Sequence, residues 1–175
     1  SIDFMNALLE NVGTASSLEA SIYQDVRGQM ELSGLLTACL EEYRSSYSEH
    51  EFVVRCSPGI TILGKDDRVR QMLDNLISNG IEHSRAGTPI VVSLEKHGRQ
   101  AVLSVSNEGP KLPEDKESLF DLYVSMRDPK HKRQEHLGLG LYIVKLVVES
   151  HGGQVQARDL EAKDGVIFTV TLPTL

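Results

Sequence analysis

The stretch QMLDNLISNGIEHS, residues 71–84, has the apolar spacing of a helix but carries two asparagines four residues apart. Asparagine is a poor interior helix residue because its amide competes for backbone groups. In a helix predicted over residues 66–84, the apolar positions and one glycine form a single stripe that should be buried. The members of this stripe are Val69, Met72, Leu73, Leu76, Ile77 and Gly80. Gln71, Asn75 and Asn79 recur at i, i+4 and i+8, so they share a separate face.

Two interpretations of this polar face are open. It is solvated, as most polar helix faces are, or it is turned into a pocket. An asparagine amide offers an acceptor oxygen and an NH₂ donor. Its neutral oxygen can bind Mg²⁺ beside a triphosphate without adding negative charge, and Mg²⁺ takes few protein ligands when phosphates supply the rest.

A second motif places two glycines, Gly138 and Gly140, at the start of a predicted helix within EHLGLGLYIVKLV, residues 135–147. Glycines let the backbone approach a ligand closely, and the free N–H groups of a helix start attract phosphate. A turn is the simpler explanation of such a pair. Upstream lies a cluster of basic side chains, namely Arg127, Lys130, His131, Lys132 and Arg133. They form either a solvated loop or a set of cations that closes over a nucleotide.

A third motif is VSNEGPKLP, residues 105–113, in which a predicted strand ends at Asn107 and Gly109 follows. One interpretation is an ordinary strand-to-turn signal. The other is an acceptor that recognises a base edge, with a glycine that admits a flat ring.

Length and composition limit the class of protein. The 175 residues suit one domain with a short appendage. The net charge of −7 argues against a general nucleic-acid binder, so no nucleic-acid partner is expected. The two cysteines, Cys39 and Cys56, have no metal-ligand spacing and suit a reduced, cytosolic setting. No apolar run is long enough for a membrane span, and no signal peptide is visible.

The remaining chain predicts hairpins and helices. Residues 2–19 form an amphipathic helix with a short coiled-coil seam, which packs either on its own domain or on a partner helix. The seam consists of Ile2, Met5, Leu9 and Val12. A strand over 28–33 ends at a cap, where Ser33 starts a helix to about residue 48. The further strands span 51–56, 60–64, 89–97, 100–108, 152–160 and 165–173, and a last helix spans 139–150. This order suggests a helical layer on one face of a mixed sheet.

These motifs, in this order, resemble the ATP-binding catalytic domain of sensor histidine kinases of the GHKL superfamily. QMLDNLISNGIEHS resembles the N box, VSNEGPKLP the G1 box, LFDLYVSMR the F box and HLGLGLYIVK the G2 box. The resemblance implies an α/β fold, a two-layer sandwich (Bergerat fold) with a mixed five-stranded sheet, three helices on one face and a mobile ATP lid over 112–128. Residues 1–27 would be the remnant of the second helix of the dimerisation domain (DHp) with a linker, and 28–175 the catalytic domain.

The resemblance also assigns roles by position. Asn79 matches the Mg²⁺-binding asparagine, and Asn75 matches a polar residue near the phosphates; these two are the expected catalytic residues. His83 is expected to pack or touch the nucleotide. Asn107 takes the place of an aspartate that accepts from the adenine amino group, and Gly109 lies beside the adenine. The other expected ATP-binding residues are Phe120 of the F box, the lid cations Arg127, Lys132 and Arg133, and Gly138, Leu139 and Gly140 of the G2 box, of which Leu139 is expected to pack the helix.

Two departures from the family pattern weaken the expected binding. Asn107 accepts without the charge assistance of an aspartate. Glu82 stands where the family often has a lysine, which shifts the neutralisation of phosphate charge to the lid cations. These departures leave open a non-catalytic nucleotide-binding module as an alternative. An anti-sigma serine kinase of the same superfamily is a further alternative, against which the helix at 2–19 argues.

The position of Asn75 separates kinases from the superfamily's ATP hydrolases, which carry there a glutamate that acts as general base on water. An amide cannot take a proton at neutral pH. The expected function is therefore binding of ATP–Mg²⁺ and transfer of the γ-phosphoryl group to a histidine on the DHp domain, for relay to a response-regulator receiver domain. The full-length protein is expected to be a homodimer, with this domain in the cytoplasm and an anchor in the bacterial inner membrane.

Overall fold

The computed structural model describes residues 2–121 and 139–175, and each helix and strand predicted there is present with slightly shifted ends. The helices are α1 (Ile2–Gln24), α2 (Leu32–Ser46), α3 (Asp66–His83), the 3₁₀ helix η1 (Glu117–Phe120) and α5 (Gly140–Ser150). The strands are β1 (Gly28–Glu31), β2 (Phe52–Cys56), β3 (Thr61–Gly64), β4 (Ile90–His97), β5 (Gln100–Glu108), β6 (Gln154–Asp159) and β7 (Gly165–Pro173). Part of the expected lid, 122–128, lies outside the described residues.

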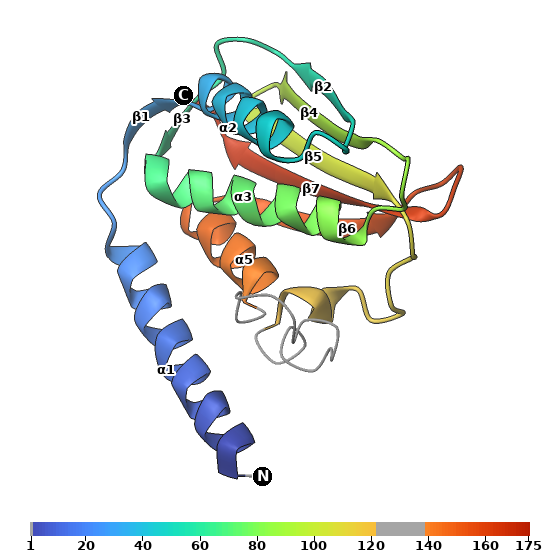
Figure 1. Ribbon diagram of the computed structural model, residues 1–175. Helices are drawn as coiled ribbons and strands as arrows, with labels where there is room; N and C mark the ends of the chain where they lie inside the picture. The colour runs from blue at the N-terminus through green and yellow to red at the C-terminus, as the bar shows by residue number, and fades with distance from the viewer. Residues whose placement is uncertain (1, 122–138) are drawn as a thin grey trace.

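Five strands form one mixed sheet in the order β2-β4-β5-β7-β6, in which β2 pairs parallel with β4 and all other pairs are antiparallel. Figure 1 shows α2, α3 and α5 side by side on one face of this sheet. Ala101, Leu103 and Val105 alternate along β5 as buried residues, as expected for a strand that turns one face to a core. The predicted fold class, a two-layer α/β sandwich with three helices on one face, is confirmed.

The strands β2 and β3 are neighbours in sequence but belong to different sheets. β3 pairs antiparallel with β1 in a separate two-stranded sheet. The backbone N–H of Leu175 donates to the carbonyl of Thr61 at 3.0 Å, so the end of the chain also lies along β3. This small sheet joins the segment after α1 to the segment before α3.

The prediction that Ser33 caps α2 is wrong. The helix begins at Leu32, and its N-cap residue Glu31 makes no side-chain cap hydrogen bond. The buried hydroxyl of Ser33 donates to the Ser57 carbonyl at 2.7 Å and accepts from the Ile60 N–H at 3.0 Å. A hydroxyl at a helix start can form hydrogen bonds either with the backbone of the helix or with a neighbouring turn. The Ser33 hydroxyl bonds to the turn between β2 and β3.

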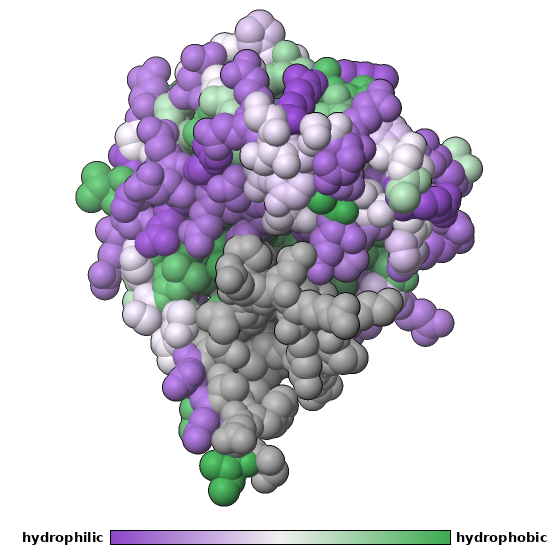
Figure 2. All heavy atoms as spheres, viewed as in Figure 1, coloured by the Kyte–Doolittle hydropathy of each residue, from purple (hydrophilic) through white to green (hydrophobic). Residues whose placement is uncertain are grey.

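The helix α1 extends away from the sandwich and is longer than predicted (Figure 1). Near its middle and end, Ala15 and Ile22 are buried, so this half packs on the domain. At its beginning, Ile2 is 72% and Leu9 65% exposed, and Figure 2 shows hydrophobic residues at the free end of the molecule that α1 forms. Packing on its own domain therefore holds for the second half of the helix, and packing of the first half on a partner helix stays a prediction. None of the helices in the described residues combines the length and apolar character needed to cross a bilayer.

Candidate functional site

The helix α3 presents its buried stripe and its polar face as the sequence predicted. All six stripe residues, from Val69 to Gly80, are buried, whereas Gln71, Asn75 and Asn79 are half-buried. Gly80 faces the sheet, where a Cβ would lie at ordinary van der Waals distance, 3.6 Å, from methyl groups of Ile90 and Val105. The polar face is thus neither core nor fully solvated, and one edge of it meets α5.

Asn75 lies against the first residue of α5. A Cβ built on Gly140 would be 3.7 Å from Asn75 Oδ1, which is ordinary van der Waals distance, so residue 140 lies directly beside the Asn75 side chain. The Nδ2 atom of Asn75 is buried without a hydrogen-bond partner, the one such side-chain atom among the described residues. An unsatisfied buried donor typically costs about 1–3 kcal/mol. This amide therefore offers a donor to a ligand at the start of α5.

The start of α5 adds backbone donors at the same place. Its N-cap residue, Leu139, makes no side-chain cap hydrogen bond, and its carbonyl accepts from the Ile143 N–H at 2.9 Å. The N–H groups of the first helical turn have no acceptor within a helix, and together with the helix dipole they favour an anion. The side chain of Leu139 is buried, which fits its expected packing role.

The third motif lies at the C-terminal end of α3. Gly109 has φ +157°, and a Cβ there would come within 2.3 Å of the His83 carbonyl oxygen, so only glycine fits. The Arg85 N–H donates to the Glu108 carbonyl at 2.7 Å and holds the two segments together. The end of β5 is thereby fixed directly beside the end of α3.

Asn107 continues the buried row of β5 towards this junction and is only 3% exposed. It pairs with Ile90 on β4 and Val166 on β7, and its Nδ2 is 3.5 Å from the Glu108 carbonyl oxygen. Gly165 leaves room for it, because a Cβ at residue 165 would lie 2.3 Å from the Asn107 carbonyl oxygen. The side chain of Asn107 is thus held by three strands on the face that the helices cover.

Other predicted residues fall elsewhere. Phe120 is buried against Phe168 of β7, with ring centroids 6.1 Å apart and planes at 90°, so it anchors η1 in the core. The side chains of His83 and Glu82 are exposed at the end of α3. Four of the expected ATP-binding residues lie outside the described residues, namely Arg127, Lys132, Arg133 and Gly138.

A polar network beside Asn75 was not predicted from the sequence. Asp74 Oδ1 accepts from the Tyr43 hydroxyl at 3.2 Å, from Arg70 Nε at 3.2 Å and from the Cys39 thiol at 3.5 Å. Burial raises the pKa of Cys39 to about 12 and also raises the pKa of Tyr43, so both groups stay protonated donors. The network joins α2 to α3 over more than thirty residues of sequence, a separation that no local pattern reveals.

The described residues contain no group of three or more His, Cys, Asp or Glu side chains that could hold a metal ion. An Mg²⁺ ion at α3 would therefore take its oxygens from Asn79 and from the phosphates of a nucleotide, as Mg²⁺ sites with phosphate ligands do. The residues present fit such a site, because Asn75 Nδ2 and the start of α5 supply donors for the phosphates.

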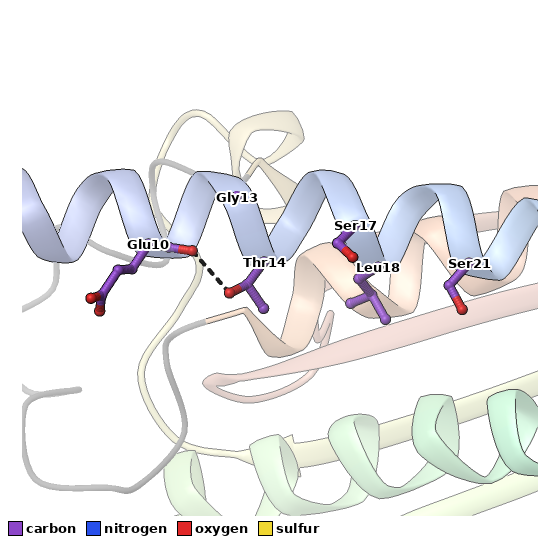
Figure 3. Close-up of a pocket in the computed structure, with 6 residues that line it drawn as sticks. All are labelled: Glu10, Gly13, Thr14, Ser17, Leu18 and Ser21. Carbon is purple, nitrogen blue, oxygen red and sulfur yellow. Dashed lines mark hydrogen bonds between the residues drawn. The ribbon is translucent and has the colours of Figure 1, made fainter.

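A separate groove of about 710 Å³ runs along α1. Figure 3 shows the side chains on one face of this helix that line it: Glu10, Gly13, Thr14, Ser17, Leu18 and Ser21. The Thr14 hydroxyl donates to the Glu10 carbonyl of its own helix at 2.9 Å. None of the described candidate residues lines this groove, so it is distinct from the candidate site.

Comparison with known proteins places this fold in a class of ATPase domains. The chain belongs to the family described as "Histidine kinase-, DNA gyrase B-, and HSP90-like ATPase", whose model matches residues 64–175. The resemblance to the catalytic domain of sensor histidine kinases is thereby confirmed at the level of the family.

Individual relatives include sensor histidine kinases. The sensor histidine kinase WalK of Bacillus subtilis strain 168 is 28% identical over 174 residues, which cover 97% of this chain and 28% of that protein. The mycobacterial sensor histidine kinase MprB matches with a TM-score of 0.73 and 25% identity over 85% of this chain and 98% of that chain. Full-length ShkA, in complex with AMPPNP, shares the fold with a TM-score of 0.72 and 24% identity over 95% of this chain and 36% of that chain. The chain spans less than half the length of the first curated relatives it matches.

Proposed function

We propose that this chain binds ATP with Mg²⁺ and serves to transfer the γ-phosphoryl group to a histidine on the dimerisation domain of its own protein. From there the group would pass to an aspartate of a response-regulator receiver domain. The observation that carries the proposal is the buried, unpartnered Asn75 amide at the start of α5. The names of WalK and MprB as sensor histidine kinases support it, as does the binding of an ATP analogue by ShkA.

The middle and the C-terminal end of α3 would contact different parts of the nucleotide. Near the middle, Asn75 Nδ2 and the N–H groups at Gly140 would donate to phosphate oxygens, and Asn79 Oδ1, one turn further on, would bind Mg²⁺. At the C-terminal end, Asn107 would accept from the adenine amino group and Gly109 would admit the ring. Bound Mg²⁺ supplies charge neutralisation for the phosphates.

The chemistry of residue 75 favours phosphoryl transfer over hydrolysis. An amide cannot accept a proton from water at neutral pH, so residue 75 cannot serve as the general base that activates a water molecule. A phosphoryl-accepting imidazole needs no such base, because its nitrogen is itself the nucleophile. The domain then contributes positioning of the phosphates and neutralisation of their charge. In this proposal the parent protein is a homodimer anchored in the bacterial inner membrane, with this domain in the cytoplasm.

Calorimetry with a non-hydrolysable ATP analogue tests the binding step. The 175-residue chain should bind the analogue in an Mg²⁺-dependent manner, and Asn79→Ala should weaken this binding about tenfold or more, since even the loss of an outer partner of a metal site costs that much. Gln71→Ala is the matched control, because Gln71 lies on the same face two turns earlier. Absence of binding by the wild-type chain contradicts the proposal and favours a regulatory module.

Phosphoryl transfer is tested by mixing the chain with the dimerisation domain of its own protein and labelled ATP. The chain alone should incorporate little label, whereas the mixture should label a histidine of the dimerisation domain. Release of inorganic phosphate without labelled histidine, from a correctly folded chain, would instead indicate an ATP hydrolase.

A further inference from the structure

The strand β6 forms one edge of the five-stranded sheet, where it pairs only with β7. A groove of about 530 Å³ follows this edge and lies between β6, α5 and the segment at η1. Its lining includes residues 153–158 without a gap, so side chains of both faces of β6 border it. The groove therefore runs along the edge of the strand, where backbone N–H and C=O groups lack ladder partners.

The groove is cationic within an acidic chain. The chain carries a net charge of −7, yet three cations, Lys116, Lys145 and Arg158, and a single carboxylate, Glu149, line the groove. Lys116 forms an ion pair with Asp159 at 3.1 Å. Neither Lys145 nor Arg158 forms an ion pair with a described residue, so their charges are available to an anion.

The position of Lys145 strengthens this argument. It is half-buried on α5, in the wall of the groove. A half-buried lysine buries its aliphatic stem and keeps its ammonium group in water, where an anionic ligand can reach it. Arg158 extends from the exposed face of β6, opposite the face on which Ala157 packs into the core. The two unpaired cations therefore lie on opposite faces of the strand.

We propose that an extended acidic peptide segment of a partner protein pairs with β6 as an additional strand of the sheet. Strand addition matches a groove that follows the strand, and it satisfies the backbone groups at the edge. Successive side chains of the added strand point to opposite faces, so neighbouring acidic residues reach Lys145 on one face and Arg158 on the other. The groove includes none of Asn75, Asn79 and Asn107. Of the expected ATP-binding residues only Phe120 lines it, and its ring packs on Phe168 in the core, so the interaction does not require the proposed nucleotide contacts.

The test measures binding of a fluorescein-labelled octapeptide in which pairs of adjacent Glu alternate with pairs of Thr, so that Glu side chains point to both faces of an added strand. Binding to the 175-residue chain is followed by fluorescence anisotropy without nucleotide. Lys145→Glu and Arg158→Glu should each weaken binding about tenfold, because each replaces an attraction by a repulsion. Lys96→Glu is the matched control, since Lys96 is an exposed lysine of β4 in the same sheet. It should leave binding unchanged.

Two further probes separate strand addition from simple charge attraction. An octapeptide with alternate N-methylated residues keeps its charge but loses N–H donors, and it should bind much more weakly. Amide resonances of Gln154, Gln156 and Arg158 should shift on addition of the unmodified peptide. A third peptide, with Gln in place of each Glu, keeps the N–H donors but loses the charge, and it should also bind more weakly. The proposal is overturned if the wild-type chain does not bind the unmodified peptide or if either altered peptide binds equally well. It is also overturned if Lys96→Glu weakens binding as much as Lys145→Glu.

Discussion

At the scale of single residues, one junction beside the candidate site depends on the absence of a side chain. Gly109 brings the end of β5 against the last residue of α3, where a Cβ would not fit, and Gly140 lies beside Asn75. The asparagine spacing predicted the polar face of α3, whereas the approach of Gly138 and Gly140 to a ligand stays a prediction. The contact between Asn75 and Gly140 could not be predicted, because it depends on how α3 and α5 pack across 65 residues of sequence.

Gly109→Ala should destabilise the chain by about 2–4 kcal/mol, because a Cβ forced onto the His83 carbonyl adds overpacking to backbone strain. Urea denaturation measures the change. Gly87→Ala is the matched control: its φ is +78° but nothing lies within 4 Å of its Cβ position, so it should cost only the strain, about 1 kcal/mol. Equal losses for the two variants would show that the junction of β5 and α3 relaxes freely.

At the scale of elements, the start of α3 is tied to the end of α1. Asp25, whose side chain is 9% exposed, binds Arg68 Nε at 2.7 Å and Lys65 Nζ at 3.0 Å, and Arg68 also donates to the Ser21 hydroxyl at 2.7 Å. The buried His151 adds a link to α5: its Nε2 accepts from the Lys65 N–H at 3.3 Å, while Nδ1 donates to the Val147 carbonyl. Burial lowers the pKa of His151 and keeps this imidazole neutral.

Asp25→Asn should lower the free energy of unfolding by about 1–2 kcal/mol at neutral pH. The hydrogen bond from Arg68, followed by that from Lys65, lowers the pKa of Asp25 below its ordinary value of 3.8. The stabilisation is therefore complete above the ordinary pKa and is lost as the pH falls through the lower pKa of the folded state. In urea denaturation, the difference between wild type and variant should be constant from about pH 7 to pH 5 and shrink below pH 4.

The control for this prediction is Glu161→Gln, which removes an exposed carboxylate without an ion pair to any described residue. It should change the stability by less than about 0.5 kcal/mol. A difference between wild type and Asp25→Asn that persists unchanged at low pH would contradict the assignment to the ionised carboxylate.

A comparison of predicted and observed elements shows which features of the fold a local sequence pattern can predict and which it cannot. The helix α3 and the strand pair β4–β5 were predicted with ends within one residue, because apolar period and turn signals are local. The separation of β2 and β3 into two sheets could not be predicted, since strand pairing is decided by distant partners. The hydroxyl of Ser33 illustrates the same limit: its residue type predicted a cap, and a turn 24 residues away took its hydrogen bond.

At the scale of the whole molecule, α1 carries an apolar seam that its own domain does not cover. Met5 is 58% and Leu9 65% exposed, and Figure 2 shows hydrophobic residues at this free end. Isolated exposed apolar residues are common, but a row at heptad spacing on one helix is typical of an interface. The expected homodimer of the parent protein provides a second copy of the same seam.

The chain should therefore self-associate weakly through α1, and Leu9→Glu should weaken the association at least about tenfold, because a charge replaces a leucine worth roughly 1.5–3 kcal/mol of burial. Sedimentation velocity over a concentration series measures this. Val26→Glu is the control: Val26 is 88% exposed but lies beyond the end of α1, so the variant should associate like wild type. Monomeric behaviour of the wild-type chain throughout the series would assign the seam to a different partner helix. Equal loss in both variants would show a general effect of the added negative charge and contradict association through the seam. Preserved self-association in Leu9→Glu would place the contact elsewhere on the molecule.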